Sequence, residues 1–413
     1  MCRSCHYSTF LCQERVTKPT LVGDGKFLIF PLYTKFTISA TLINYSKLAK
    51  IMITIVGAGP AGSYLAYLLA KKGEDVTIVE EHESIGSPIQ CTGIVTGSIE
   101  KFVKLPNNVI ANRCSKVIVV SKNNRIVANT DEIVMWRNKF DEFMANKATD
   151  VGVKILTNHQ FINFNNKNSI RIKNNNNNHI KNIESEIIVG ADGPSSAVAK
   201  SAGLKTNTKF YVGMQAKVKL KMDFDAFETH FGGNFPNFFG WCVPESEDTV
   251  RLGLGAFKNA KDYFYKFLEE RTGKKEVLCW ESGIYPIYNP KQIIQKENIY
   301  LIGDAATQVK ATTGGGIIPS LKAAQTLCDC IINKKNYNKE LKKHSGRELL
   351  LHLKIRNTLN KFSDDDYDYL LKLMSQEKVK KILKKYDRDT PIPLVLNLLL
   401  KEPRFLLFSR FVI

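Results

Sequence analysis

The stretch that most constrains this chain is ITIVGAGPAG, residues 53–62, in which three glycines follow an apolar run. The run Ile53–Val56 predicts a buried strand, and the glycines after it predict a tight turn. A helix is predicted from Pro60 to about Lys72. The N-terminus of such a helix presents unpaired N–H groups and a partial positive charge, which suit a phosphate group.

Each glycine has a separate expected role. Gly57 permits the turn, Gly59 lets the backbone approach a pyrophosphate, and Gly62 lets the helix pack closely on its strand. A second strand, predicted over Val76–Val79, ends on Glu80, where a carboxylate would meet the ribose hydroxyls of an adenosine. A GxGxxG motif alone is a weak signal. With both strands, the helix and the acidic residue in register, it predicts a dinucleotide site.

Composition sets wider limits. The chain has 413 residues, of which 44% are hydrophobic, so it can bury a large core and form two or three subdomains. No run approaches the roughly 18 apolar residues of a membrane-spanning helix. The net charge of +19 suits nucleic acid, an anionic membrane or an anionic substrate. Because no nucleic-acid-binding signature accompanies it, the charge points to a membrane or an anionic lipid, although an AT-rich genome would also favour lysine. Nine cysteines without a secretory signal indicate a cytoplasmic protein.

Residues 1–51 do not match the pattern that follows. They contain a CxxC pair, Cys2 and Cys5, with His6 and Cys12 nearby, but no second CxxC. A zinc site needs four ligands at set spacings, so no metal site is predicted. Because Met52 directly precedes the first strand, residues 1–51 are interpreted as a disordered extension or the product of an upstream start codon.

The rest of the chain alternates between predicted strands and helices. These elements are a hairpin over 116–120 and 125–128, a helix over 139–151 that Arg137 precedes, a strand over 153–156, a strand meander with an Asn-rich loop over 161–183, an antiparallel sheet over 210–255, a helix over 262–271, and C-terminal helices separated by Asp364–Asp366 and by Pro391 and Pro393.

Two further segments end buried strands with glycine turns. EIIVGADGPSS, residues 186–196, turns at GADG, and NIYLIGDAATQVKATTGGGI, residues 298–317, turns at Gly303-Asp304 before a Gly-rich loop. A helix from Ile318 to about Ile332 is predicted to follow.

Taken in order, GAGPAG, GADG and GDAA resemble the FAD-binding framework of the glutathione-reductase-like superfamily, in the branch that includes p-hydroxybenzoate hydroxylase. The resemblance implies an α/β fold class: a Rossmann-like, glutathione-reductase-type FAD-binding domain, an antiparallel-sheet substrate domain and a C-terminal helical region. The expected divisions are an N-terminal extension (1–51), the first part of the FAD-binding domain (52–207), the substrate or prenyl-binding domain (208–296), the last part of the FAD-binding domain (297–336) and the C-terminal helical region (337–413).

The resemblance also implies roles for single residues. Asp304 would bond a ribitol hydroxyl of FAD, the helix start at Gly314–Ile317 would place N–H groups near the flavin pyrimidine ring, and Arg137 would contact the cofactor. The expected cofactor-binding residues are Gly57, Gly59, Gly62, Glu80, Cys91, Gly93, Arg137, Asp304, Gly315, Gly316 and Ile317.

Two stretches narrow the branch. SPIQCTG (87–93) and QVKATTGGGI (308–317) are similar to archaeal geranylgeranyl reductases, which saturate the isoprenoid chains of membrane lipids. PNFFGWCVP (236–244) resembles the P-x-x-Y-x-W-x-F-P signature of that family. It departs from the signature with Phe239 for Tyr and Val243 for Phe, and Glu245 stands where the family usually has Lys. The apolar wall is kept, but one hydroxyl and one cation are lost.

The expected reaction is the reduction of an isolated alkene by hydride transfer from reduced flavin and protonation of the second carbon. Such a reaction needs a long apolar slot that excludes water. Phe238, Phe239 and Trp241 are the expected substrate-binding residues, with ordinary sheet core as the alternative interpretation. Cys91 is the expected catalytic residue, as a thiol beside the flavin, against the alternative of a small space-filling side chain. Lys310 is interpreted as a contact to a lipid phosphate or the flavin, or as a plain loop lysine.

Electrons would come from reduced ferredoxin or from NAD(P)H. The absence of a second GxGxxG with strand and helix context favours a protein donor slightly. An alternative function is that of an oxygen-dependent FAD monooxygenase or halogenase, and a third is that of a non-enzymatic flavin module recruited through the N-terminal CxxC. The expected partners are an isoprenoid lipid and the inner face of the cell membrane, without nucleic acid. For the C-terminal segment Leu394–Ile413, membrane docking and covering of the FAD domain both stay open.

Overall fold

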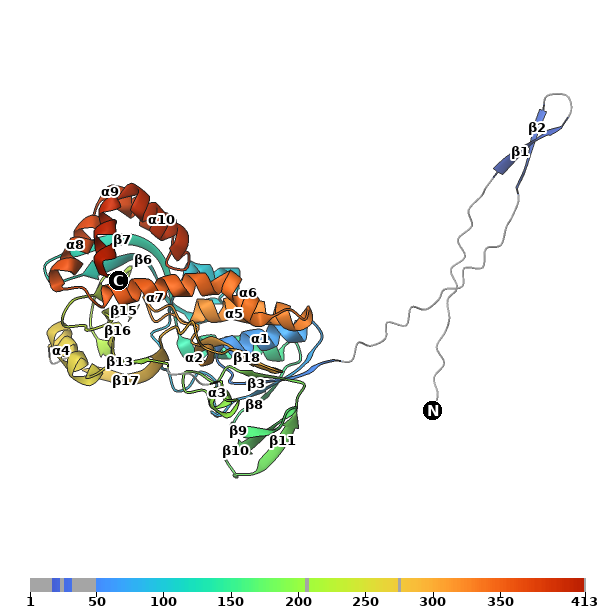
Figure 1. The fold of residues 1–413 in the computed structure, drawn as a ribbon, viewed down its shortest axis with the longest axis horizontal. Coiled ribbons are helices and arrows are strands. Elements are labelled where there is room, and N and C mark those ends of the chain that lie inside the picture. The colour runs from blue at the N-terminus through green and yellow to red at the C-terminus, as the bar shows by residue number, and fades with distance from the viewer. Residues whose placement is uncertain (1–16, 23–25, 32–49, 205–207, 274–275, 412–413) are drawn as a thin grey trace. The chain divides into compact units, whose positions relative to one another are not determined.

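The chain divides into two compact units, Met1–Ala49 and Lys50–Ile413, named here the N-terminal unit and the main unit. The computed structural model describes residues 17–22, 26–31, 50–204, 208–273 and 276–411 (Figure 1). In the N-terminal unit, the described residues form one antiparallel hairpin, β1 (Thr17–Val22) with β2 (Lys26–Pro31). The CxxC pair lies outside the described residues.

A largely parallel sheet forms one layer of the main unit, in the order β18-β19-β12-β3-β4-β8. Only β18 runs antiparallel to its neighbour. Most of its strands are short and rich in Val and Ile, as expected for a sheet that is covered on both faces. The strands predicted at 53–56, 76–79 and 153–156 are confirmed. The bounds are β3 (Met52–Val56), β4 (Asp75–Val79), β8 (Lys154–Leu156), β12 (Ile187–Gly190), β18 (Gln295–Lys296) and β19 (Ile299–Leu301).

Three helices pack with this sheet: α1 (Pro60–Lys71), α2 (Arg137–Thr149) and α5 (Ile317–Ile332). Helix α1 contacts both α2 and α5. Arg137 is the first residue of α2 rather than a residue preceding the helix, because the extended residue is Trp136. The short helix α3 (Ala197–Ser201) follows the GADG turn.

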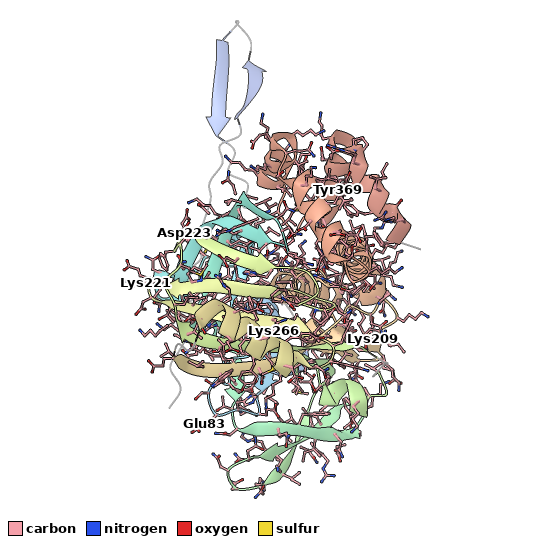
Figure 2. The ribbon with its side chains drawn as sticks, turned by 90° about the vertical axis from the view of Figure 1, so that its left-hand side faces the viewer. Glu83, Lys209, Lys221, Asp223, Lys266 and Tyr369 are labelled. Carbon is pink, nitrogen blue, oxygen red and sulfur yellow. The ribbon has the colours of Figure 1, made fainter. Side chains whose placement is uncertain are left out.

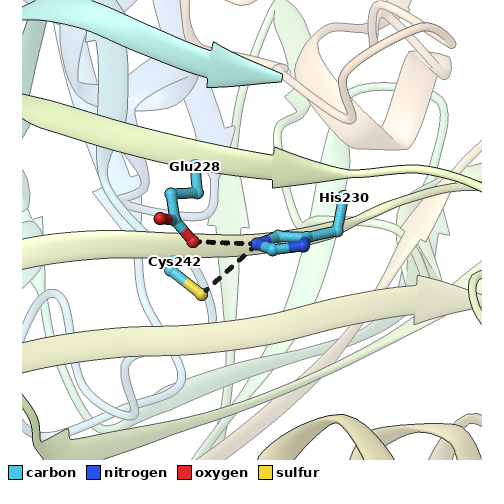
Figure 3. A group of neighbouring side chains, drawn as sticks. All are labelled: Glu228, His230 and Cys242. Atoms are coloured by element: carbon cyan, nitrogen blue, oxygen red, sulfur yellow. Dashed lines mark hydrogen bonds and ion pairs between the residues drawn. The ribbon is translucent and has the colours of Figure 1, made fainter. Parts of the chain in front are cut away.

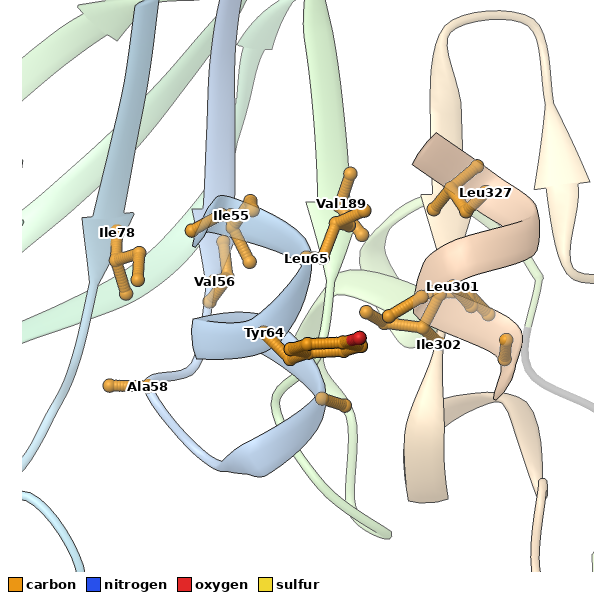
Figure 4. Close-up of a cluster of buried hydrophobic side chains, with 14 of the residues drawn as sticks. Ile55, Val56, Ala58, Tyr64, Leu65, Ile78, Val189, Leu301, Ile302 and Leu327 are labelled. Carbon is orange, nitrogen blue, oxygen red and sulfur yellow. The ribbon is translucent and has the colours of Figure 1, made fainter. Parts of the chain in front are cut away.

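The core of this layer joins distant parts of the sequence. In Figure 4, Leu65 of α1 and Leu327 of α5 lie in the same apolar cluster as Ile55 and Val189 of the strands. Because β12 pairs with β3, the GADG turn lies beside the GAGPAG turn.

An eight-stranded sheet forms the second layer, in the order β17-β13-β16-β15-β14-β6-β7-β5. All pairs are antiparallel except β14 with β6. Three of its strands come from residues 94–135, so the strand pairing does not follow the expected linear division at 207/208. The bounds are β5 (Ile94–Thr96), β6 (Ile110–Val120), β7 (Arg125–Met135), β13 (Phe210–Lys219), β14 (Ala226–His230), β15 (Gly240–Ser246), β16 (Thr249–Ala256) and β17 (Val277–Pro286).

Helix α4 (Ala260–Thr272) packs on β13 and β16 of this sheet. Figure 2 shows Lys266 on α4, and Lys221 and Asp223 at the end of the sheet between β13 and β14. The predicted meander is a separate three-stranded sheet of β9 (His159–Asn166), β10 (Ser169–Asn174) and β11 (Ile180–Glu184).

The C-terminal region is helical, as predicted, and α8 and α9 contact β7 of the large sheet. Asp364–Asp366 and Pro391 were expected to separate helices, but they begin helices instead. Ser363 caps the first turn of α8 in a capping box with Asp366, and Pro391 is the first residue of α10. The helices are α6 (Tyr337–Leu341), the π-turn η4 (Lys342–Gly346), α7 (Arg347–Leu359), α8 (Asp364–Met374), α9 (Glu377–Lys385), α10 (Pro391–Lys401) and the 3₁₀ segment η5 (Pro403–Phe411).

Candidate functional site

One cavity of about 1510 Å³ is lined by both sheets and by the C-terminal helices. It starts at the carboxyl ends of β3 and β4, where ligands bind in open α/β sheets. It then passes the loops 86–93 and 312–316 and continues along the large sheet to α8 and α9. A single small-molecule site usually occupies about 300–1,000 Å³. The cavity is therefore large enough for a dinucleotide and a second ligand together.

The glycine turn is tightly packed at two positions and open at a third. A Cβ on Gly57 would lie 2.4 Å from the Ala191 carbonyl oxygen, and one on Gly62 would lie 2.1 Å from the Gly57 carbonyl oxygen. A Cβ on Gly59 would meet no atom within 4 Å. Gly59 is also the N-cap of α1, whose first turn has neither a side-chain cap nor an acidic residue. Helix N–H groups are therefore left facing open space beside Gly59, as an anion requires.

Glu80 lies at the end of β4, beside this turn. Its Oε2 accepts the Ala58 N–H at 2.8 Å, and its Oε1 lies 2.7 Å from Nδ1 of His82. The contact to Ala58 holds the carboxylate against the turn, and a carboxylate has about four acceptor positions in all. The His82 N–H also donates to Oε1, at 3.0 Å, so about one position remains for a ribose hydroxyl, and the geometry suits the expected role.

Asp304 lies in the 3₁₀ turn η3 (Gly303–Ala306), and it lines the cavity. Burial raises the pKa of its carboxyl to about 6, against the opposing effect of the Arg137 charge. A Cβ on Gly316 would lie 3.0 Å from Oδ1 of Asp304. Gly316 is the N-cap of α5, which also has no side-chain cap. A half-buried carboxylate that lines the cavity thus lies beside the uncapped N-terminus of α5.

Arg137 and Cys91 lie together on the cavity wall. Nη2 of Arg137 donates to both oxygens of Asp141, at 2.8 and 2.9 Å. Burial lowers the pKa of Arg137, but the Asp141 carboxylate and the Cys91 thiol outweigh that effect and raise it. The Cys91 sulfur also accepts the N–H of Gly93 at 3.4 Å. The structure therefore brings together the thiol and the arginine that the sequence places in one site.

The aromatic segment forms the next part of the wall. Phe238 and Phe239 stack with ring centroids 4.4 Å apart, and Trp241 lies edge-on to Phe239 at 5.9 Å. All three line the cavity, and Phe238 and Phe239 are buried. The sequence left a substrate slot and a sheet core as alternatives. In the structure the same rings belong to a core cluster and face the cavity.

A buried arginine that the sequence analysis did not single out holds the Cys91 loop. Nη1 of Arg251 donates to the carbonyl oxygens of Cys91 and Thr92, at 3.1 and 3.2 Å. Its Nε lies 2.7 Å from Oε1 of Glu245, and its Nη2 lies 3.8 Å from Oε1 of Glu281. Glu245, which stands where the resembling family usually has Lys, thus anchors this arginine. A partner of Glu245 is therefore Arg251, a residue of the same chain.

Gln215 connects the Cys91 loop to the aromatic wall. Its Oε1 accepts the Thr92 hydroxyl at 2.8 Å and the indole N–H of Trp241 at 3.3 Å, while its amide nitrogen donates to Glu281. Arg251 and Gln215 are both buried on adjacent strands. The relative position of the thiol and the indole is therefore set by side chains of the large sheet.

Helix α7 holds the Gly-rich loop from the other side. Arg356, which is fully buried, donates to the carbonyl oxygens of Ala311 at 3.1 Å and Thr312 at 2.5 Å, and its guanidinium lies 4.7 Å from the Phe238 ring centroid. One turn earlier, Nδ1 of His352 lies 2.7 Å from the Thr312 hydroxyl oxygen. Burial lowers the pKa of His352 to about 3, so the ring is neutral. The C-terminal region therefore positions the loop at the start of α5.

Lys310 was expected to meet a phosphate or the flavin, or to be a plain loop residue. In the structure it is buried and ion-paired with Asp389, which also accepts the Thr96 hydroxyl at 2.6 Å. Arg388 pairs with Glu132 at 2.7 Å in the same region. These contacts join the segment before α10 to the Gly-rich loop and the large sheet.

A second polar cluster lies within the large sheet. Figure 3 shows Glu228, His230 and Cys242 directed toward one another, with Nε2 of His230 3.0 Å from Oε2 of Glu228 and 3.9 Å from the Cys242 sulfur. Two guanidinium groups also lie on Glu228, Arg271 at 2.7 Å and Arg125 at 3.4 Å. Their charges already balance the carboxylate and oppose a bound cation. The cluster is accordingly a buried ion-pair centre that joins strands to α4.

The functional residues that the sequence analysis missed are Arg251, Gln215, Arg356 and Glu281. Arg251 stands within TVRLGLG, a strand in which every residue is buried. An arginine inside such an apolar run is a usable signal, because a buried guanidinium requires partners. Arg356 and Gln215 stand in segments of mixed polarity and carry no comparable signal.

The described residues fit FAD. The open space at Gly59 suits a pyrophosphate, Glu80 suits the adenosine ribose, and the half-buried Asp304 with the start of α5 suits the polar part of the flavin and its ribitol.

Comparisons with known proteins agree with this geometry. Residues 50–235 match the family model described as an FAD binding domain. The digeranylgeranylglycerophospholipid reductase 3 of Methanosphaera stadtmanae is 27% identical over 372 residues, which cover 81% of this chain and 94% of the relative. The digeranylgeranylglycerophospholipid reductase of Methanocaldococcus jannaschii is 27% identical over 357 residues, which cover 78% of this chain and 90% of the relative.

Solved structures show the same fold. A geranylgeranyl bacteriochlorophyll reductase-like protein of Thermoplasma acidophilum superposes with a TM-score of 0.77 at 23% identity, covering 88% of this chain and 99% of that one. A flavin-dependent brominase superposes with a TM-score of 0.66 at 15% identity, covering 87% of this chain and 99% of that one.

Proposed function

Because the chain belongs to the geranylgeranyl reductase family of FAD-binding proteins, we propose that it is an FAD-dependent reductase of lipid double bonds. Its substrates are the geranylgeranyl chains of archaeal ether-lipid precursors, and its role is in membrane phospholipid biosynthesis. The observation that carries the proposal is the single cavity that leads from the glycine turn to the aromatic wall. An apolar chain in that cavity would reach the cofactor without leaving the protein.

The chain's own residues hold the cofactor through backbone groups and carboxylates. The N–H groups at the start of α1 bind the pyrophosphate beside Gly59, and Glu80 binds the adenosine ribose. Asp304 accepts a ribitol hydroxyl, and the start of α5 at Gly315–Ile317 donates to the flavin ring. Gly93 and Arg137 complete the contacts to the cofactor from the Cys91 side.

Reduced FAD supplies a hydride, and the protein must supply the apolar slot and a proton. Phe238, Phe239 and Trp241 bind the prenyl chain, because flat rings offer apolar contact area at a low cost in side-chain entropy. The same rings exclude water from the alkene. Cys91 gives the proton to the second carbon. Arg251 and Gln215 orient its loop, so that the thiol and the indole keep a fixed separation.

The source of electrons and the location follow from the same proposal. Reducing equivalents come from a donor protein such as ferredoxin, with NAD(P)H as the alternative donor. The lipid substrate places the enzyme at the inner face of the cell membrane. Among the described helices, none combines the length and apolar character that a membrane crossing requires. The contact with the membrane is therefore proposed to be peripheral.

The test is a single-turnover reaction without oxygen. Purified full-length protein loaded with FAD is reduced chemically and mixed with digeranylgeranylglyceryl phospholipid, and mass spectrometry follows the lipid. Gain of two hydrogen atoms per double bond, with reoxidation of the flavin, is the expected result. A Trp241→Ala variant should reduce the lipid more slowly while it retains FAD, because the indole lies on the apolar part of the cavity wall.

Two outcomes would reject the proposal. A protein that binds FAD but leaves the lipid unchanged is not this reductase. If oxygen is then consumed with the lipid and an oxygenated product forms, the enzyme is a monooxygenase, a class that shares the fold.

A further inference from the structure

The C-terminal helices carry a group of exposed apolar side chains, named here the C-terminal patch: Leu396 and Leu400 of α10 with Leu406 and Leu407 of η5. Their exposed fractions are 56%, 77%, 55% and 56%. Large apolar side chains scattered singly on a surface need no explanation, but a contiguous group marks an interaction site. Among the residues of α10, only Pro391 is buried, although the helix is almost wholly apolar.

A basic helix adjoins this patch. Helix α9 contacts α10, and its sequence EKVKKILKK buries Val379 and Ile382. Four of its five lysines are exposed: Lys378, Lys381, Lys384 and Lys385. Among the described residues, Lys381, Lys384 and Lys385 form no ion pair with a carboxylate. Lys385 lies over the Tyr386 ring, and the three charges are not neutralised by any described carboxylate. Cations of this kind beside exposed leucines are typical of a segment that lies in the interface of an anionic bilayer.

The patch is continuous with the candidate site. Lys384 and Lys385 at the end of α9, and Leu394 on α10, line the cavity that also contains the glycine turn and the aromatic wall. Leu396 and Leu400 lie further along α10, outside the cavity lining. Figure 1 places α9 and α10 together at the outer end of the C-terminal region. A surface lipid would therefore meet the leucines, the lysines and the cavity at one place.

We propose that α9, α10 and η5 form a membrane-docking surface for an anionic phospholipid bilayer, through which a lipid chain enters the cavity without crossing water. The entry of a lipid chain into the cavity rests on the proposed function, whereas docking on the membrane does not. Helix α10 has 11 residues and is about 16 Å long, at about 1.5 Å per residue. It lies in the interface, with Leu396 and Leu400 in the acyl region and the lysines of α9 at the phosphate level.

Vesicle flotation of the purified full-length protein tests the docking surface without any assay of activity. Wild type should float with phosphatidylglycerol vesicles, float at least tenfold less with phosphatidylcholine vesicles, and lose binding as salt is raised. The variant Leu396→Glu/Leu400→Glu should bind phosphatidylglycerol vesicles at least tenfold less. The matched control is Leu278→Glu/Ile293→Glu, which places the same charges at two exposed apolar positions elsewhere and should bind as wild type does.

Two results would overturn the docking proposal: wild type that does not float, or equal loss of binding in the control variant. If wild type does not float and is instead a dimer that the α10 variant converts to monomer, the patch is assigned to a second copy of the chain. For the entry route, the α10 variant should reduce detergent-dispersed lipid at the wild-type rate and vesicle-borne lipid at least tenfold more slowly. Equal rates on both would overturn that route, whereas failure of wild type on both lipids would reject the proposed function and leave the flotation result standing.

Discussion

The two ends of the cavity are built in different ways. At the cofactor end, around Gly59 and the start of α5, the contacts come from backbone N–H groups and from glycines that leave room for a ligand. At the substrate end, the Cys91 loop is held by side chains of the large sheet, and Arg251 lies 160 positions from Cys91. A backbone-built site can be specified by a few adjacent residues, whereas a site built from side chains requires the fold to bring distant residues together.

The largest expected effect is a loss of stability when the contacts of Arg251, which lie at the substrate end of the cavity, are removed. Arg251→Met removes the guanidinium from Glu245 and Glu281, and it frees the carbonyls of Cys91 and Thr92. Breaking a buried ion pair costs about 3–5 kcal/mol. Because Lys217 still lies 2.7 Å from Glu245, we expect the low end, about 3 kcal/mol, in urea unfolding.

The matched control is Lys219→Met, which removes an exposed ion pair with Asp248 from the same sheet and should leave the free energy of unfolding close to that of wild type. FAD affinity in Arg251→Met should fall by less than about tenfold, because the contacts of Gly59, Glu80 and Asp304 are kept and only the Cys91–Gly93 side of the cofactor site is loosened. Equal destabilisation by the two substitutions would mean that Arg251 does not hold the substrate end.

The next prediction compares two glycines at the cofactor end, one whose substitution should lower the stability of the protein and one whose substitution should weaken FAD binding. Gly62→Ala places a Cβ 2.1 Å from the Gly57 carbonyl oxygen, and overpacking of this kind costs about 1–3 kcal/mol. Gly59→Ala meets no protein atom, so the stability of the FAD-free protein should change by less than about 0.5 kcal/mol. Its Cβ would occupy the space of the pyrophosphate, so FAD affinity should fall at least about tenfold. Thermal unfolding measures the change in stability, and fluorescence titration measures the change in FAD affinity. Unchanged FAD affinity in Gly59→Ala would mean that the pyrophosphate does not bind beside Gly59.

This difference explains what could be predicted from the sequence. The strands before GAGPAG, GADG and GDAA and the helices after GAGPAG and GDAA depend on short local patterns, and the structure has them as expected, whereas the short helix α3 after GADG was not predicted. Glu80 and Asp304, which follow two of these strands, line the cavity. The parallel pairing of β14 with β6 and the buried partners of Lys310 and Glu245 depend on contacts between segments far apart in the chain. A single sequence contains no signal for such pairs, since a lysine or glutamate is exposed far more often than buried.

A smaller effect concerns the pH dependence of FAD binding. The pKa of Asp304 is about 6 without FAD, above its ordinary 3.8. Ionisation of this carboxyl therefore destabilises the FAD-free fold as the pH rises from about 4 to about 6. A ribitol hydroxyl that donates to the carboxylate would stabilise the ionised form, so binding releases a proton. Affinity should therefore be about tenfold weaker at about pH 5 than at about pH 7. Asp304→Asn should bind FAD more weakly and lose the pH dependence of FAD affinity. If the variant keeps the wild-type dependence of affinity on pH, Asp304 does not contact FAD.

The smallest effect concerns a hydroxyl at the boundary of the two ends. Tyr285 lines the cavity, its ring lies against Phe238, and its hydroxyl is buried without a hydrogen-bond partner among the described residues. Burial and the neighbouring Tyr211 raise its pKa well above the usual value, against the opposing charge of Arg356, so the proton stays bound. Tyr285→Phe should leave stability unchanged or raise it by up to about 1 kcal/mol, because an unpaired polar atom is removed.

Gly255 provides the partner for a double-mutant cycle, since a Cβ there would lie 2.0 Å from the Tyr285 hydroxyl oxygen. Gly255→Ala should cost about 1–3 kcal/mol alone and clearly less in the Tyr285→Phe background. If Tyr285→Phe instead lowers stability by more than about 1 kcal/mol, the hydroxyl has a partner that the protein itself does not supply. A bound water or a ligand would then serve as that partner, and the substrate end would gain a polar contact at the point where its aromatic wall meets the Gly-rich loop.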